Sequence, residues 1–190
     1  MPKDYLLDTN VISILANPAN KDYAHVRAQF DALPLGTIVA LPVIAIAEIE
    51  FGMLKTTSAD PKQQAAMRKF FQDHPLHFGI NDATVKPYAL VRAQLWNTFG
   101  VLKSGKRHSH QEKLPDELRD RATAKWIGVD ERDLLIVTVA LEYNLTFATK
   151  DRNNEMVRIE AAVDTIVASG AWPEKLRLAD WTPPRPSTPP

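Results

Sequence analysis

The chain has 190 residues, and 45% of them are hydrophobic, which is enough to bury the core of one globular domain. Lys and Arg together number 23, as do Asp and Glu, so no net charge attracts nucleic acid to the whole surface. The lack of cysteine excludes disulfides, zinc–thiolate sites, iron–sulfur clusters and thiol nucleophiles. The start of the chain has no signal-peptide pattern, and the apolar stretch 37–47 is too short to span a bilayer. We therefore expect a cytoplasmic protein with no membrane partner.

Strand and helix signals alternate along the chain. The apolar run 5–7 predicts a first strand, and the segments 11–16 and 23–33 predict helices after it. The β-branched run 37–41 predicts a second strand, and Pro42 then stands at the start of a helix, where proline is tolerated. Further helices are expected over 43–54, 62–72, 82–99 and 156–168, a buried helix from Asp133 onward, and strands over 75–79, 145–149 and 176–178.

This alternation favours an α/β fold, a three-layer sandwich with a mostly parallel central sheet. We expect a single domain over residues 1–181, with a polar, basic-leaning insertion near residues 103–120. The tail 182–190 is rich in proline, and we expect it to be disordered. Trp172 and Trp181 are expected to pack the terminal segment onto the domain.

Four acids from separate parts of the chain are candidates for one site. Asp8 and Asp151 each follow a strand, and parallel sheets bind ligands beyond the carboxyl ends of their strands. Asp133 opens the buried helix, so we expect it near the same edge, where helices begin. Glu48 lies roughly 9 Å into its helix at 1.5 Å per residue, and its side chain leans back towards the helix start.

Four carboxylates gathered at one edge repel one another unless a cation lies between them. Hard oxygen ligands without sulfur suit Mg²⁺, with Mn²⁺ as a possible substitute. Such an ion activates water and stabilises charge on a phosphoryl group, so the predicted chemistry is hydrolysis of a phosphodiester. Whether one ion or two bind is left open.

The segments that carry these acids also form a recognisable series. They read Leu-Leu-Asp-Thr-Asn-Val-Ile-Ser from Leu6, Ile-Ala-Glu-Ile-Glu-Phe-Gly from Ile46, Asp-Leu-Leu-Ile-Val-Thr-Val-Ala from Asp133, and Phe-Ala-Thr-Lys-Asp from Phe147. In order, residue type and approximate spacing, the series resembles the four motifs of PIN-domain ribonucleases, the VapC-type toxins of bacterial toxin–antitoxin pairs. The resemblance runs from Tyr5 to about Asp151, and residues 176–181 resemble the closing strand of that family.

The resemblance implies a Mg²⁺-dependent endoribonuclease that is usually a homodimer and is held inactive by a cognate antitoxin. It implies catalytic roles for Asp8, Glu48, Asp133 and Asp151, and we take Asp8 and Asp133 as metal ligands. Two segments depart from the compact members of the family, the insertion at 103–120 and the long stretch 153–171. The insertion could alter the contacts to RNA, to a second copy or to the antitoxin.

Plainer roles compete for three of these acids. Asp8 could cap the helix that starts near Val11, a common role for Asp. Asp130 and Asp133 compete to cap the buried helix, and we expect Asp130 to cap it and Asp133 to serve the site. Helix geometry does not separate Glu48 from Glu50, so the choice of Glu48 rests on the resemblance. Asp151 stands in a segment that also reads as an ordinary surface turn.

Small polar residues beside the acids are candidates for supporting roles. Thr9, Asn10 and Thr149 could orient the acids or their bound waters, although such residues after strands also occur for purely structural reasons. In the insertion, Lys103, Lys106 and Arg107 could contact RNA phosphate, the antitoxin or only solvent.

Two other functions remain compatible with the sequence. One is a HAD-type phosphatase with Asp8 as nucleophile and Lys150 followed by Asp151 downstream, although Asn10 stands where that family has a second Asp. The other is a non-catalytic relative that only binds RNA or a protein.

Overall fold

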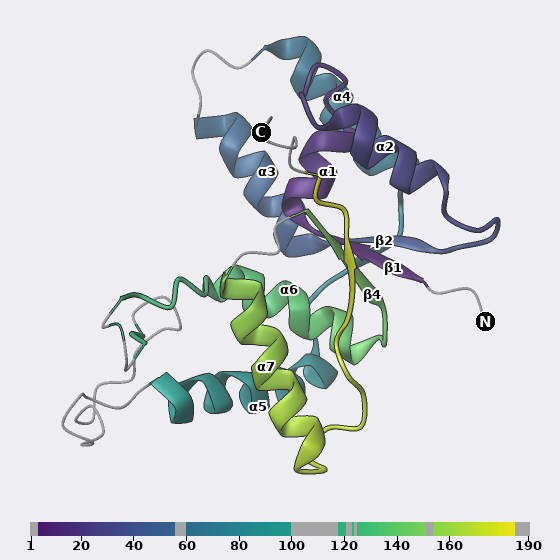
Figure 1. Ribbon diagram of the computed structural model, residues 1–190. Coiled ribbons are helices and arrows are strands. Elements are labelled where there is room, and N and C mark those ends of the chain that lie inside the picture. Colours follow the sequence, from purple (N-terminus) through teal and green to yellow (C-terminus); the bar gives the residue numbers. More distant parts are fainter. Residues whose placement is uncertain are drawn as a thin grey trace, which may run out of the picture. The chain divides into compact units, whose positions relative to one another are not determined.

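The computed structural model describes residues 4–55, 60–99, 118–120, 123, 125–150 and 154–184, and Figure 1 shows its ribbon. The chain divides into two compact units. The first comprises Met1–Phe78, Thr146–Asp151 and Leu178–Pro190, and the second comprises Gly79–Leu145 and Arg152–Arg177. None of the described helices is long and apolar enough to cross a membrane.

Within the described residues, the strands form one sheet in the order β3-β2-β1-β4-β5. Their bounds are Tyr5–Leu7 for β1, Val39–Pro42 for β2, His77–Phe78 for β3, Thr146–Thr149 for β4 and Arg177–Asp180 for β5. β1 pairs in parallel with both β2 and β4 (Figure 1), and β2 pairs in parallel with β3. The predicted α/β fold with a mostly parallel central sheet is confirmed.

β1 lies in the middle of this sheet because its side chains are apolar on both faces. Leu6 and Leu7 point to opposite faces, and both are fully buried. On the neighbouring strand β4, Phe147 and Ala148 are buried in the same way. The central pair of strands therefore forms a rigid base for the residues that follow it.

The helices described in the first unit are α1 (Thr9–Leu15), α2 (Tyr23–Asp31), α3 (Val43–Lys55) and α4 (Pro61–Asp73). α1 begins at Thr9, before the predicted start near Val11, because Asp8 already has the extended conformation of an N-cap residue. α3 follows β2 without a loop, so its first turn lies at the carboxyl end of that strand. α1 packs against both α2 and α3.

The last described segment returns to the sheet. Trp181 is buried, and its ring centroid lies 6.2 Å from that of Tyr5 on the central strand. The prediction that Trp181 packs the terminal segment onto the domain is confirmed. Of the tail 182–190, which was predicted to be disordered, residues 182–184 are described and residues 185–190 lie outside the described residues.

The second unit contains α5 (Asp82–Phe99), α6 (Glu131–Glu142) and α7 (Asn154–Ala168), and α5 packs against the other two (Figure 1). α6 is buried over most of its length, as predicted from its apolar sequence. It begins at Glu131, and the Asp130 carboxylate before it accepts a hydrogen bond from the backbone N–H of Arg132 at 2.8 Å. The predicted capping role of Asp130 is thereby confirmed.

Because of Tyr88 of α5, we expect the free energy of unfolding of the second unit to vary with pH in the alkaline range. Its hydroxyl donates to the Glu131 carboxylate, and burial together with this contact raises the pKa of Tyr88 from 10.0 to about 12. The associated stabilisation is therefore complete below pH 10 and is lost as pH rises from 10 to 12. We expect the urea midpoint to fall across this window, and to fall less in Tyr88→Phe. Equal falls in the two proteins would contradict the assignment.

Candidate active site

Asp8 and Thr149 meet at the carboxyl ends of two neighbouring strands. Leu7 of β1 lies opposite Ala148 of β4, so the next residue of each strand lies beside the other. The backbone N–H of Asp8 donates to the Ala148 carbonyl at 2.9 Å, and the Thr149 hydroxyl donates to Oδ2 of Asp8 at 2.8 Å. Both side chains are buried, Asp8 with 6% and Thr149 with 1% of its surface exposed. Asp8 is thus a buried carboxylate held in a defined orientation.

The position of Asp8 in the sheet is one at which parallel sheets bind ligands. The chain places β2 and β3 on one side of β1, and β4 and β5 on the other. The strand order therefore changes direction between β1 and β4, and open α/β sheets bind ligands beyond the carboxyl ends of the strands at such a point. Asp8 and Thr149 occupy this place.

The Asp8 side chain does not cap the helix that follows it. Asp8 is the N-cap residue of α1 by backbone conformation, yet its side chain makes no capping hydrogen bond. Burial of a carboxylate is costly, so a buried acid that does not cap the helix calls for another role. The simple capping role is therefore not supported.

Glu48 lies on the side of α3 that faces α1. The hydroxyl of Thr9, the residue after Asp8, donates to Oε2 of Glu48 at 2.8 Å. Glu50 lies on another side of the helix, where its carboxylate accepts two hydrogen bonds from the Arg68 guanidinium of α4, each 3.1 Å long. The structure thus separates two acids that helix geometry alone did not separate, and it places Glu48 next to the Asp8 segment.

Three contacts hold Thr149 and Lys150 at the end of β4. The Trp181 N–H donates to the Thr149 carbonyl at 2.8 Å, and the Thr182 hydroxyl donates to the Lys150 carbonyl at 2.5 Å. The Lys150 ammonium lies 2.7 Å from Oδ2 of Asp22, the residue that precedes α2. These contacts position the last residues described before Asp151, which itself lies outside the described residues.

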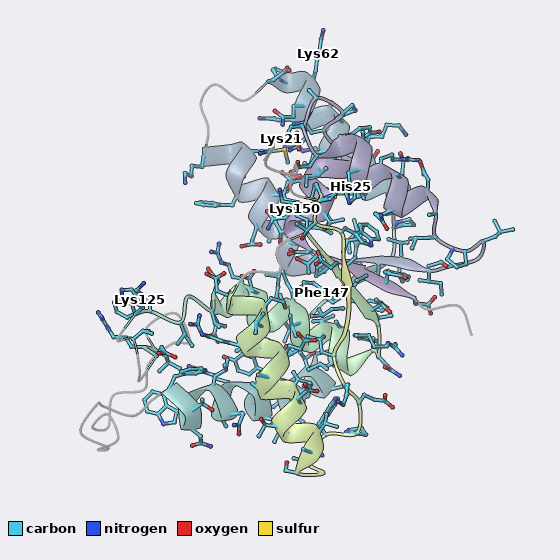
Figure 2. All side chains as sticks on the ribbon, in the orientation of Figure 1. Lys21, His25, Lys62, Lys125, Phe147 and Lys150 are labelled. Carbon is cyan, nitrogen blue, oxygen red and sulfur yellow. The ribbon has the colours of Figure 1, made fainter. Side chains whose placement is uncertain are left out.

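The Lys150–Asp22 pair was not predicted from the sequence. The Lys150 hydrogen bond, reinforced by Lys21 and His25, keeps the pKa of Asp22 below its ordinary value of 3.8. Figure 2 labels these three basic side chains. Asp22 is therefore anionic at neutral pH and holds Lys150 from a position 128 residues away in sequence.

The other predicted site residues are placed as follows. Asp133 lies in the first turn of α6 in the second unit and is half-buried, and Asn10 is exposed on α1. In the part of the chain that the structure describes, no group of three or more His, Asp or Glu side chains could hold a metal ion. The convergence of all four acids therefore stays a prediction. The structure shows two hydrogen-bonded pairs, Asp8 with Thr149 and Thr9 with Glu48, and Asp8 and Thr9 are consecutive residues.

Comparisons with known proteins agree with this fold. A family model described as the PIN domain matches residues 5–161. No curated protein matches the chain. Among solved structures, VapBC2 from Rickettsia felis bound to promoter DNA aligns with 18% identity and a TM-score of 0.56, over 93% of this chain and 98% of that chain.

Two further structures align over similar lengths. VapBC-1 from nontypeable Haemophilus influenzae has 18% identity and a TM-score of 0.52, over 93% of this chain and 97% of that chain. FitAcB from Neisseria gonorrhoeae has 22% identity and a TM-score of 0.50, over 81% of this chain and 92% of that chain. At these identities the structures show that the fold is shared.

The parallel sheet, with the buried Asp8 at the carboxyl end of its central strand, defines an α/β domain with a candidate active site at that edge. The family model covers most of the chain, and the chain therefore belongs to the PIN-domain family. PIN domains are nucleases, hydrolases of phosphodiester bonds that generally use divalent metal ions.

Proposed function

We propose that this PIN domain is a Mg²⁺-dependent endoribonuclease and the toxin of a toxin–antitoxin pair. The observation that carries the proposal is the contact between Asp8 and Thr149, in which the Thr149 hydroxyl orients a buried carboxylate at the carboxyl end of the central strand. The aligned solved structures include toxin–antitoxin complexes, which supports a cognate antitoxin as a partner. We propose further that the protein is cytoplasmic and acts as a homodimer.

The residues of the proposed site suit a hard divalent cation. Their donors are carboxylate and hydroxyl oxygens, and the chain contains no cysteine to favour a softer metal. Asp8 and Asp133 would hold Mg²⁺, with Mn²⁺ as a substitute. The bound ion supplies a Lewis acid that stabilises negative charge on the phosphoryl oxygens.

The chain's own residues then orient the reactants and move the proton. Thr149 fixes the Asp8 carboxylate, and Thr9 fixes that of Glu48. Glu48 accepts a proton from the attacking water, the role that a positioned carboxylate commonly has in hydrolysis. Asp133 and Asp151 complete the proposed set of acids, as the family motifs imply.

The phosphatase alternative loses its support. The chain belongs to the PIN-domain family, and Asn10, which replaces the second Asp of the phosphatase motif, is exposed on α1. A non-catalytic relative would lack turnover under any divalent metal, and the cleavage experiment separates that case from an active enzyme.

The proposal is tested by incubating the purified protein with mixed RNA and with DNA of matched length, in Mg²⁺ or in EDTA. We expect internal cleavage of RNA in Mg²⁺ and none in EDTA. Binding of RNA without cleavage under Mg²⁺ and Mn²⁺ would instead identify a non-catalytic relative. Expression in a bacterial host is expected to arrest growth, and co-expression of the neighbouring antitoxin gene is expected to relieve the arrest.

Replacing Thr149 by Val removes the hydroxyl that orients Asp8 while it keeps the volume and shape of the side chain. We expect RNA cleavage to fall by roughly 10- to 100-fold, the usual effect of losing a group that orients a metal ligand. Thr146→Val is the matched control, because Thr146 lies on the same strand and no described residue makes a hydrogen bond to its buried hydroxyl. Equal activity in the two variants would contradict a role for Thr149.

Glu48→Gln and Glu50→Gln form a second matched pair on one helix. Glu48→Gln is expected to lower cleavage by about 100-fold, because the side chain can no longer accept a proton. Glu50→Gln only weakens a solvent-screened surface ion pair with Arg68, and should leave activity close to that of the wild type. Initial rates of cleavage at saturating Mg²⁺ distinguish the two acids, and the reverse order of effects would overturn the choice of Glu48.

A further inference from the structure

A short hairpin in the second unit presents an exposed tryptophan. Residues 118–120 and 125–127, here called the Trp126 hairpin, pair in antiparallel fashion with Arg119 opposite Trp126. The Ile127 N–H donates to the Leu118 carbonyl at 2.9 Å, and the Asp120 N–H donates to the Lys125 carbonyl at 2.8 Å. Leu118 and Ile127 are almost fully buried, so they anchor the hairpin in the unit.

Side chains stabilise the hairpin at both ends. The Asp120 carboxylate accepts hydrogen bonds from the N–H and the hydroxyl of Thr123, at 2.8 and 2.9 Å. Arg158 of α7 donates to the Ile127 carbonyl at 2.6 Å. The Trp126 hairpin is therefore a built element that holds its side chains in fixed positions.

The outward side of the hairpin combines an aromatic ring with positive charge. Trp126 keeps 53% of its surface exposed, and the carbon of the Arg119 guanidinium lies 3.8 Å from its ring centroid. At this distance the guanidinium stacks on the ring and fixes its orientation. Lys125, labelled in Figure 2, precedes Trp126 in the hairpin and is exposed.

We propose that the Trp126 hairpin is a stacking platform for single-stranded RNA. A base stacks on the Trp126–Arg119 pair, and Lys125 contacts the adjacent phosphate. Proteins that bind single strands combine aromatic stacking with basic side chains in this way, and stacking accepts any base because every base has a π face. The inference rests on the proposed function in that RNA is the substrate.

Lysine distinguishes this surface from most protein interfaces. Lysine is depleted in protein interfaces, whereas tryptophan and arginine are enriched there. Among the described residues of the hairpin, Arg119 and Lys125 are exposed and cationic. Lys125 therefore favours RNA as the occupant, and antitoxin binding by the same variants is the competing outcome.

The test measures RNA binding separately from cleavage. In an Asp8→Asn background, which leaves the RNA intact, fluorescence anisotropy gives the Kd for an unstructured RNA of about 12 nucleotides. We expect Trp126→Ala to raise this Kd about 10-fold and Trp126→Phe to restore it to within about 3-fold of the parent. Val157→Ala, at a similarly exposed apolar residue of the same unit, is the control and should have no effect. Duplex RNA, whose bases are already stacked, should bind all variants equally.

Salt dependence separates the stacking contact from the phosphate contact. For single strands, each lost phosphate contact lowers the slope of log Kd against log salt concentration by about 0.7. We expect this reduction for Lys125→Ala, whereas Trp126→Ala should weaken binding and leave the slope unchanged. RNA binding should quench tryptophan fluorescence in the parent protein. This quenching should disappear in Trp126→Phe, although that variant still binds RNA.

Two results would overturn the proposal. One is an unchanged Kd for single-stranded RNA in Trp126→Ala. The other is unchanged RNA affinity together with loss of antitoxin binding, which would assign the hairpin to a protein partner. These binding measurements do not depend on cleavage. Failure of the ribonuclease proposal would be seen separately, as a lack of RNA cleavage by the wild type.

Discussion

We expect replacement of Asp8 by Asn to lower the proposed RNA cleavage by about a thousandfold. The change removes one negative charge from a buried position where the Thr149 hydroxyl orients the carboxylate. If a metal ligand at this point supplies about 4 kcal/mol of transition-state stabilisation, its loss corresponds to roughly three powers of ten in rate. The measurement is the single-turnover rate of cleavage at saturating Mg²⁺.

Asp4→Asn is the control for this prediction. Asp4 lies just before the opposite end of β1, and its Oδ1 accepts a hydrogen bond from the Ile38 N–H at 3.0 Å. An Asn side chain can accept the same hydrogen bond, so the fold and the activity should persist. Comparable losses of activity in both variants would point to damage to the sheet rather than to loss of a ligand.

We expect Mg²⁺ to raise the thermal stability of the wild-type protein. A ligand present at about a hundred times its Kd stabilises the folded state by about 2.7 kcal/mol. For a chain of this size, that free energy corresponds to a rise in Tm of roughly 5–10 °C. Differential scanning fluorimetry across a Mg²⁺ titration measures the shift directly.

The same titration also tests whether repulsion among the acids lowers the Tm of the metal-free protein. Without metal, neighbouring carboxylates destabilise the folded state, so Asp8→Asn is expected to raise the Tm of the metal-free protein. The variant should also lose most of the Mg²⁺-dependent rise. A wild-type Tm indifferent to Mg²⁺, combined with no effect of the substitution, would contradict a cluster of acids.

The fold could be predicted from the sequence because its signals are local. The apolar run 5–7, the β-branched run before Pro42 and the apolar helix after Asp130 each determine their own element. The clearest errors are at helix starts, because α1 begins at Thr9 and α7 at Asn154, each two residues before the predicted start. The apolar periodicity does not register the first residues of a helix.

The candidate site was predictable only in part. Asp8 could be found because a strand that ends on an acid is visible in a few consecutive residues. The choice between Glu48 and Glu50 depends on Thr9 and Arg68, which lie 39 and 18 residues away from their respective partners. Contacts of this range are formed by tertiary packing, so no pattern within one helix contains them.

Two further features were missed for similar reasons. The Lys150–Asp22 pair joins segments 128 residues apart, and neither residue stands out in its own segment. Trp126 is one tryptophan among four, and only the pairing with Arg119 shows that its ring is exposed and stacked. A search for tryptophan flanked by basic residues would have found Lys125 beside it, but would not have found the stacked arginine.

The most direct test compares the Mg²⁺ dependence of RNA cleavage with that of thermal stability, in the wild type and in Asp8→Asn. If Asp8 anchors a metal-dependent ribonuclease site, both properties of the wild type respond to Mg²⁺ with the same midpoint, and both responses are lost in Asp8→Asn. Cleavage that persists in EDTA, or that is equal in the two proteins, would show that the chemistry does not depend on this site.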